Sequence, residues 1–302
     1  MDLKKKLYLL IDAGGTYFKS VIANENAEIT TGSAFQIDSY SEGPADKIIN
    51  AYREVITRGL TCIEKNGGEL GGIGISTPGP FDYEKGIPLM KHKFASIYGL
   101  NLPDLFRTIP GVKPDVPVCA MHDTTAALAG EYLLGYAKGY ANVALVTLGT
   151  GLGFAYSQNG EIQYNMEGGP RISAYKLPYK NGILEDYVSR RGILGMYERK
   201  SGKSVENIDV SDIGGWANQG ESTSIEVFNE LGTILTKNLY DILDEQSIQC
   251  LLFGGQISRS FPHMEKSLMN GLSNIKSLEK ISRVKNIDNA ALFGVLWKIL
   301  NN

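Results

Sequence analysis

The sequence has few of the residues that build disulfide frameworks and metal sites. Its 302 residues include three cysteines, three histidines and two tryptophans. The cysteines, Cys62, Cys119 and Cys250, lie far apart in apolar surroundings. We therefore expect buried free thiols in the reducing cytoplasm, because a disulfide framework needs a dense and regular set of cysteines.

Long apolar runs and an excess of either charge are also missing. No segment approaches the length of a membrane span, and the run Leu7–Ile11 is too short for a signal peptide. The net charge is −3, so the sequence lacks the excess of positive charge that binding to nucleic acid or to an anionic membrane requires. These absences favour a cytoplasmic protein that acts on a small molecule.

The composition that remains is that of a globular enzyme. The chain is 43% hydrophobic and 21% charged, and its length allows two domains with separate cores. Strand–turn–helix units alternate along it, which is typical of an α/β architecture. An apolar stripe at helical spacing predicts a helix over 45–65.

Two glycine-rich turns follow apolar runs about half a chain apart. Leu7–Ile11 leads into Asp12-Ala-Gly-Gly-Thr16, and Val143–Val146 leads into Thr147-Leu-Gly-Thr-Gly-Leu-Gly153. Glycine after a buried strand lets backbone N–H groups approach an anion closely, so the pair predicts two phosphate loops. Either turn alone also occurs in ordinary hairpins. Asp12 could instead be a turn-forming residue, and Lys19 could be a solvated charge on a strand.

The strand–loop–hairpin plan of residues 7–31 recurs from residue 143, and this repetition indicates two related lobes. A third glycine pair, Gly254-Gly255, ends another apolar run and suits the nucleoside part of a nucleotide. The candidate nucleotide-binding residues are Asp12, Gly14, Gly15, Thr16, Lys19, Gly149, Thr150, Gly151, Gly254 and Gly255.

Asp123 lies where a predicted strand, 116–121, meets a predicted helix, 125–136. A carboxylate at such a junction faces the crevice in which α/β sheets bind ligands. The alternative is a helix N-cap, a common role for aspartate at this position. The neighbouring His122 is a candidate substrate contact, with a purely structural role as its alternative.

These motifs, in this order, resemble the ROK (repressor, open reading frame, kinase) sugar kinases of the actin, hexokinase and Hsp70 ATPase superfamily. The resemblance covers essentially the whole chain. It extends to the turn Thr77-Pro-Gly-Pro80 on the sugar side and to Ala290–Gly294 in the closing helix.

The resemblance implies a fold of two lobes with a cleft between them, each lobe a mixed sheet flanked by helices (ribonuclease H-like). The small lobe would comprise 1–122 completed by 288–302, and the large lobe 123–287. It further implies a glucokinase-like enzyme that uses ATP and Mg²⁺ and forms a homodimer. Asp123 would be the general base, and Asp12 would hold Mg²⁺ through water. The implied substrate contacts are Pro78, Gly79, His122, Asp123, Glu167 and Glu185.

Two positions depart from the family pattern. The histidine of the family's Glu-x-x-His run is replaced by Pro170, and the amide before the catalytic aspartate is replaced by His122. No cysteine or histidine lies between Gly168 and Ser189, so we expect no structural zinc. Because imidazole and amide offer different donors and acceptors, we expect a substrate other than plain glucose, such as a β-glucoside or a disaccharide.

Three other functions compete with the kinase. A repressor of the same family would need a DNA-binding segment, for which a first strand near residue 7 leaves no room in this sequence. A sensor that binds sugar or nucleotide without turnover is kept open by His122 and Pro170. Use of a phosphoryl donor other than ATP also stays open.

Overall fold

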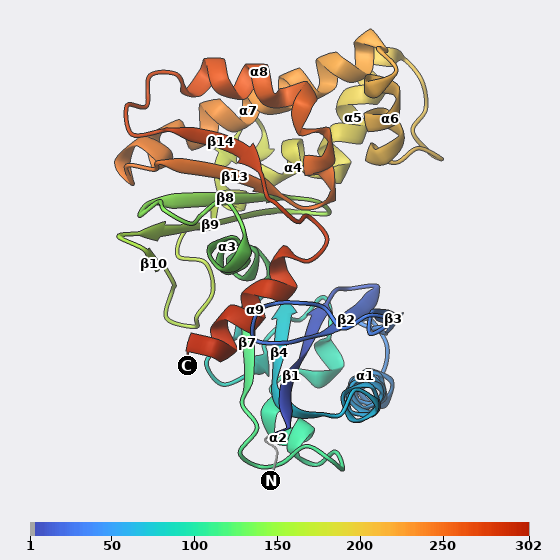
Figure 1. Cartoon of the computed structure of the whole chain (residues 1–302). Helices are drawn as coiled ribbons and strands as arrows, with labels where there is room; N and C mark the ends of the chain where they lie inside the picture. The colour runs from blue at the N-terminus through green and yellow to red at the C-terminus, as the bar shows by residue number, and fades with distance from the viewer. Residues whose placement is uncertain (1–3, 302) are drawn as a thin grey trace. The chain divides into compact units, whose positions relative to one another are not determined.

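The apolar run before the first glycine turn forms the central strand of a five-stranded sheet. The computed structural model describes residues 4–301, and this sheet has the order β3-β2-β1-β4-β7 (Figure 1). Its strands are β1 (Lys5–Ala13), β2 (Tyr17–Ala23), β3 (Phe35–Asp38), β4 (Gly68–Thr77) and β7 (Val118–His122). Strands β1, β2 and β3 pair antiparallel, whereas β4 is parallel to both β1 and β7.

Helices cover both faces of this sheet, which explains why β1 is apolar without alternation. Helix α1 (Ala45–Lys65) packs on one face, where a methyl group on Gly59 would meet Leu9. Helix α9 (Ala290–Asn301) packs on the other, where a methyl group on Gly74 would meet Val295. The helix predicted over 45–65 is therefore confirmed at both ends.

A close helix crossing holds the C-terminal segment against the first half of the chain. Helix α3 (Asp123–Leu134) packs along α9 (Figure 1). A methyl group on Gly294 would lie 1.7 Å from the carbonyl oxygen of Ala126, and one on Gly130 would lie 2.0 Å from that of Ala290. Only glycine lets the two backbones approach so closely.

A second five-stranded sheet repeats the plan of the first. Its order is β10-β9-β8-β13-β14, with two antiparallel pairs followed by two parallel pairs. Its strands are β8 (Val143–Leu148), β9 (Leu152–Gln158), β10 (Glu161–Ile162), β13 (Cys250–Gly254) and β14 (Lys280–Arg283). The repeated order confirms the internal repetition that the sequence predicts.

The remaining helices and short strands surround the two sheets. The α-helices are α2 (Leu102–Arg107), α4 (Glu185–Val188), α5 (Arg190–Ser201), α6 (Val210–Asn218), α7 (Ser222–Glu245) and α8 (Phe261–Leu272). The 3₁₀ helices are η1 (Ala95–Ile97), η2 (Ala174–Lys176) and η3 (Gln256–Ser260). Two short hairpins pair β5 (Phe81–Asp82) with β6 (Ile87–Pro88) and β11 (Pro178–Tyr179) with β12 (Gly182–Ile183).

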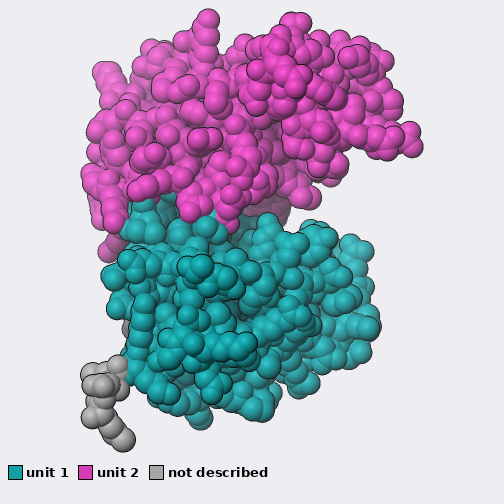
Figure 2. All heavy atoms as spheres, turned by 45° about the vertical axis from the view of Figure 1, so that its right-hand side comes forward, with its two compact units in different colours: residues 1–134, 164–169, 289–302 teal, residues 135–163, 170–288 magenta. Residues whose placement is uncertain are grey.

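The chain forms two compact units, each with its own core (Figure 2). Unit 1 comprises Met1–Leu134, Tyr164–Gly169 and Asn289–Asn302, and unit 2 comprises Gly135–Gln163 and Pro170–Asp288. These units differ from the predicted lobes in that α3 and 164–169 belong to unit 1. The lobe boundary at 122 stays a prediction. Residues 1–3 and 302, which the predicted small lobe includes, lie outside the described residues.

The structure bears on two expectations drawn from composition. Cys62, Cys119 and Cys250 are all free thiols, as predicted, but only Cys250 is buried, whereas Cys62 and Cys119 are partly exposed. Within residues 4–301, no helix combines the length and the apolar character that crossing a bilayer requires.

We predict that Gly294→Ala destabilises the protein by about 3 kcal/mol, because the added methyl group overpacks against the backbone of α3. Gly215→Ala is the matched control, since a methyl group there would meet nothing within 4 Å in helix α6. The control should gain about 0.5–1 kcal/mol from helix propensity. Urea unfolding of both variants measures the difference, and equal stabilities would contradict the crossing described above.

Candidate active site

The first glycine turn joins β1 to β2 and is held by hydroxyl groups from the segment after β3. Gly14 N–H donates to the carbonyl of Tyr17 at 3.1 Å. The hydroxyls of Ser39 (2.8 Å) and Ser41 both donate to the carbonyl of Gly15. These bonds fix the turn and leave Thr16 exposed, so its hydroxyl and the N–H groups of Gly15 and Thr16 can meet an anion.

Asp12 lies at the end of β1, opposite Lys19 of β2. Burial, followed by the charge of Asp123, raises the pKa of Asp12 to about 6, although the Ser76 hydroxyl and Lys19 lower it. Two carboxylates that repel each other in this way are stabilised by a cation bound near them. Asp12 and Asp123, predicted from separate motifs, are therefore close enough to interact in unit 1.

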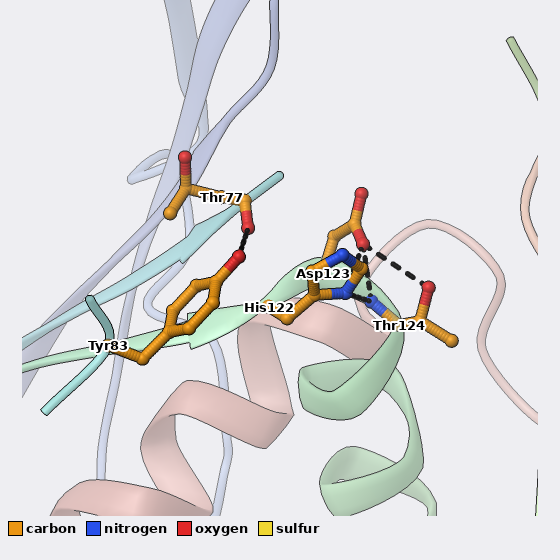
Figure 3. Close-up of polar contacts among 5 residues, drawn as sticks. All are labelled: Thr77, Tyr83, His122, Asp123 and Thr124. Atoms are coloured by element: carbon orange, nitrogen blue, oxygen red, sulfur yellow. Dashed lines mark hydrogen bonds and ion pairs between the residues drawn. The ribbon is translucent and has the colours of Figure 1, made fainter. Parts of the chain in front are cut away.

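Asp123 begins helix α3, and one of its oxygens accepts all of its hydrogen bonds (Figure 3). Oδ1 accepts from the Thr124 N–H at 2.6 Å and from the Thr124 hydroxyl at 3.2 Å. His122 Nδ1 lies 2.9 Å from the same oxygen and forms an ion pair when protonated. The other carboxylate oxygen points away from these donors, so it is open to a ligand (Figure 3).

These donors keep Asp123 ionised. Desolvation raises the pKa of Asp123. The charge of His122 and the hydrogen bonds from His122 and Thr124 together outweigh this effect and lower the pKa to about 2. The same Nδ1 accepts from the Thr124 N–H at 3.2 Å, so this nitrogen is already engaged within the segment 122–124. The ring nitrogen Nε2 of His122 is then left as the polar atom that can meet a ligand.

Tyr83 joins the segments around His122, and the sequence prediction missed it. Its hydroxyl donates to the Thr77 carbonyl at 3.3 Å, and its ring meets the His122 ring edge-on at 5.9 Å (Figure 3). Its N–H donates to the carbonyl of Glu167 at 2.9 Å. A methyl group on Gly79 would lie 3.1 Å from the Tyr83 hydroxyl. Tyr83 thus connects Gly79, His122 and Glu167.

The predicted sugar-side residues of unit 1 therefore surround one aromatic ring. Pro78 and Gly79 follow β4, next to the end of β7 that carries His122. Glu167 is exposed on the 164–169 segment, and its backbone carbonyl is the group that bonds to Tyr83. Its carboxylate is free to face a ligand.

The remaining predicted residues lie in unit 2, around the end of β8. Gly254 pairs with Thr147, and a methyl group on Gly255 would lie 2.3 Å from the Leu148 carbonyl oxygen. The structure thus brings the Gly149–Gly151 turn and the Gly254-Gly255 pair together, although they are about a hundred residues apart in the sequence. Thr150 is exposed at this turn.

Glu185 contacts the second glycine turn directly. Its Oε2 accepts from the N–H of Leu152 at 2.9 Å, and a methyl group on Gly151 would lie 2.6 Å from that oxygen. Arg190 N–H donates to the Gly149 carbonyl at 2.9 Å. In unit 2, Glu185 therefore fixes the turn through one oxygen, a contact that its predicted role did not include.

Thr124, Ser76 and Tyr83 are the residues of the site that the prediction missed. Thr124 was detectable, because a hydroxyl residue directly after an N-terminal aspartate is a common donor to it. Ser76 lies at the end of β4, opposite Asp12 on the neighbouring parallel strand, and lowers the pKa of that carboxyl. Tyr83 follows a Pro-Gly-Pro turn, but nothing local indicates that it meets His122.

The acidic groups fit a magnesium ion held mainly by water and phosphate. Within the described residues 4–301, no three histidine, cysteine or acidic side chains gather around one point. Mg²⁺ in phosphoryl-transfer sites keeps several waters and takes one or two carboxylates, and Asp12 supplies one with a raised pKa. The expectation of no structural zinc stays a prediction.

Known proteins of similar sequence include kinases and a repressor. The chain is 25% identical over 276 residues to the glucokinase of Thermotoga maritima, covering 84% of each chain. It is 23% identical to the xylose repressor of Bacillus subtilis, covering 87% of this chain and 68% of the repressor.

Solved structures of similar shape support the predicted fold class. The ROK family glucokinase of Streptomyces griseus, determined with glucose and AMPPNP, superimposes with a TM-score of 0.81 at 20% identity. The comparison covers 98% of this chain and 100% of the other. The predicted actin-like α/β fold is confirmed. The ROK family profile matches residues 8–171, more than half of the sequence, and the chain belongs to the ROK family.

Proposed function

We propose that this chain is an ATP-dependent kinase that transfers the γ-phosphoryl group to a hydroxyl of a hexose-type sugar or glycoside. The names of its relatives support a sugar kinase, since they include the glucokinase of Thermotoga maritima. The structural neighbour from Streptomyces griseus was determined with glucose and AMPPNP, a sugar and an ATP analogue. We also propose that the protein works in the cytoplasm as a homodimer.

The observation that carries the proposal is the position of Asp123. Its Oδ1 is occupied by His122 and Thr124 and its other oxygen is open. Asp123 is also near enough to Asp12 of the first phosphate loop to raise the pKa of that carboxyl. Phosphoryl transfer needs a positioned acceptor and charge stabilisation more than covalent help from the protein. Asp123 would orient the sugar hydroxyl and take its proton as the oxygen attacks.

The glycine turns would bind the nucleotide. In unit 1, the backbone of Gly14, Gly15 and Thr16 and the Lys19 ammonium would hold phosphate oxygens, and in unit 2 the 149–151 turn would do the same. Gly254 and Gly255 would lie against the nucleoside. A magnesium ion, held by Asp12 through water, would neutralise charge on the phosphates.

His122 and the replaced histidine determine which sugar fits. His122 would meet a sugar hydroxyl through Nε2 alone, where an amide would offer two donors and an acceptor. Pro170 offers no hydrogen bond in place of the family histidine. Glu167 and Glu185 would accept hydrogen bonds from other hydroxyls. We therefore propose a glycoside or disaccharide in preference to plain glucose.

A second candidate is a sensor that binds sugar without phosphorylating it. The observation that favours it is the low pKa of Asp123, about 2, which weakens this carboxylate as a base. Sugar binding that raises the melting temperature, without ADP release on any sugar of a broad panel, would favour the sensor over the kinase.

We predict that Asp123→Asn lowers sugar-dependent ADP release by about 10²–10⁴-fold, because the amide cannot accept the proton. Sugar binding, measured by calorimetry, should change far less. Asp115→Asn is the matched control, since Asp115 is an exposed carboxylate outside the site and its loss should leave turnover unchanged. Equal turnover in Asp123→Asn and wild type would contradict the assigned base.

We predict that Asp12→Asn abolishes turnover yet stabilises the free protein at pH 8 by about 2–3 kcal/mol. The folded pKa of Asp12, about 6, lies above the ordinary value of 3.8 for an aspartate, so the folded state binds this proton more tightly. Its contribution to stability is therefore full below pH 4 and is lost as the pH rises through about 6.

Urea unfolding without nucleotide or magnesium, at pH 4 and at pH 8, measures this effect. The gain of Asp12→Asn over wild type should be present at pH 8 and disappear at pH 4. A gain that is the same at both pH values would show that the carboxylate is not strained by burial.

A further inference from the structure

Lys93 lies over the first glycine turn, although no sequence motif includes it. It is partly buried just before η1, and a methyl group on Gly15 would lie 2.9 Å from its Nζ. The same methyl group would lie 3.1 Å from both Cδ and Cε of Lys93. The absence of a side chain on Gly15 therefore gives the lysine its place beside the turn.

The backbone next to Lys93 is rigid. The following residue, Phe94, is 1% exposed and has a positive φ of 51°. Its N–H donates to the Ser41 carbonyl at 2.6 Å, and its ring stacks on Phe18 at 5.9 Å. Since the Ser41 hydroxyl donates to the carbonyl of Gly15, one short segment fixes both the turn and the lysine.

The Lys93 ammonium has no anionic partner among the described residues 4–301. Two other lysines of unit 1 are placed differently. Lys19 lowers the pKa of Asp12, and Lys91 lies over the ring of Tyr98 at 5.9 Å. An ammonium positioned beside this glycine turn, with no protein carboxylate to neutralise it, is suited to an anionic ligand.

A packing role is the competing explanation. The aliphatic stem of a lysine commonly covers apolar or backbone surface while its charge stays in water. If Lys93 only covered Gly15, methionine, which has a similar shape and no charge, would replace it without loss. The charge is therefore the property that separates the two explanations.

We propose that the Lys93 ammonium binds the phosphoryl group that is transferred and stabilises its negative charge during transfer. This inference rests on the proposed kinase function. The bond between the γ-phosphorus and the bridging oxygen of ATP breaks, the sugar oxygen bonds to phosphorus, and the hydroxyl proton goes to Asp123. Lys93 keeps its protons throughout and donates hydrogen bonds to a phosphoryl oxygen.

The test compares Lys93→Met with Lys91→Met, which removes a neighbouring exposed charge. Calorimetry without sugar should show that Lys93→Met binds AMPPNP about tenfold more weakly or worse, while ADP, which lacks the third phosphate, binds nearly as before. Turnover with neutral sugars should fall about 100-fold. Lys91→Met should match wild type in all three measurements, and Lys93→Arg should recover the preference for AMPPNP.

Other outcomes would overturn the proposal. Unchanged AMPPNP binding and turnover in Lys93→Met would assign the lysine to packing. A loss confined to acidic sugars would show that the anion belongs to the acceptor and not to the nucleotide. If wild type phosphorylates no sugar, the kinase function fails, but the difference between AMPPNP and ADP binding still decides the role of Lys93. Circular dichroism of each variant confirms that it is folded.

Discussion

The placement of one carboxylate, that of Asp123, is the constraint on which the site depends. Its Oδ1 is fixed by His122 and Thr124, so its other oxygen has a defined direction. The strand β7 and helix α3 that carry it are held in turn by the crossing of α3 with α9, where Gly130 and Gly294 allow backbone contact. The last helix of the chain thereby fixes the position of a residue near its middle.

The second constraint is the cost of gathering charge around that carboxylate. Asp12 is strained by burial and by Asp123, and its pKa rises to about 6. A site that holds two acidic groups near each other is less stable empty than filled, since cations and donors relieve the repulsion. Such strain at a binding site is a common exchange of stability for function.

Local patterns predicted much of the fold, together with the glycine turns and the two aspartates of the candidate site. Apolar runs ended by glycine identified β1, β8 and β13, because buried strands and tight turns leave signals within a few residues. A local pattern, an aspartate between a strand and a helix, also identified Asp123.

Contacts between distant segments left no such signal. The ring of Tyr83 against His122, the bond of Glu185 to Leu152 and the place of Lys93 over Gly15 all depend on the folded chain. Helices α5 to α7 carry no site motif, and no prediction covered them.

The central claim is that a phosphoryl group passes from ATP to a sugar hydroxyl in this site. Phosphorus NMR of the wild-type protein with ATP, Mg²⁺ and a panel of hexoses and β-glucosides tests it most directly, because it identifies the product itself. We expect a new sugar phosphomonoester signal that grows in step with ADP on at least one sugar. ADP accompanied only by inorganic phosphate, or no reaction on a sugar that demonstrably binds, would contradict it.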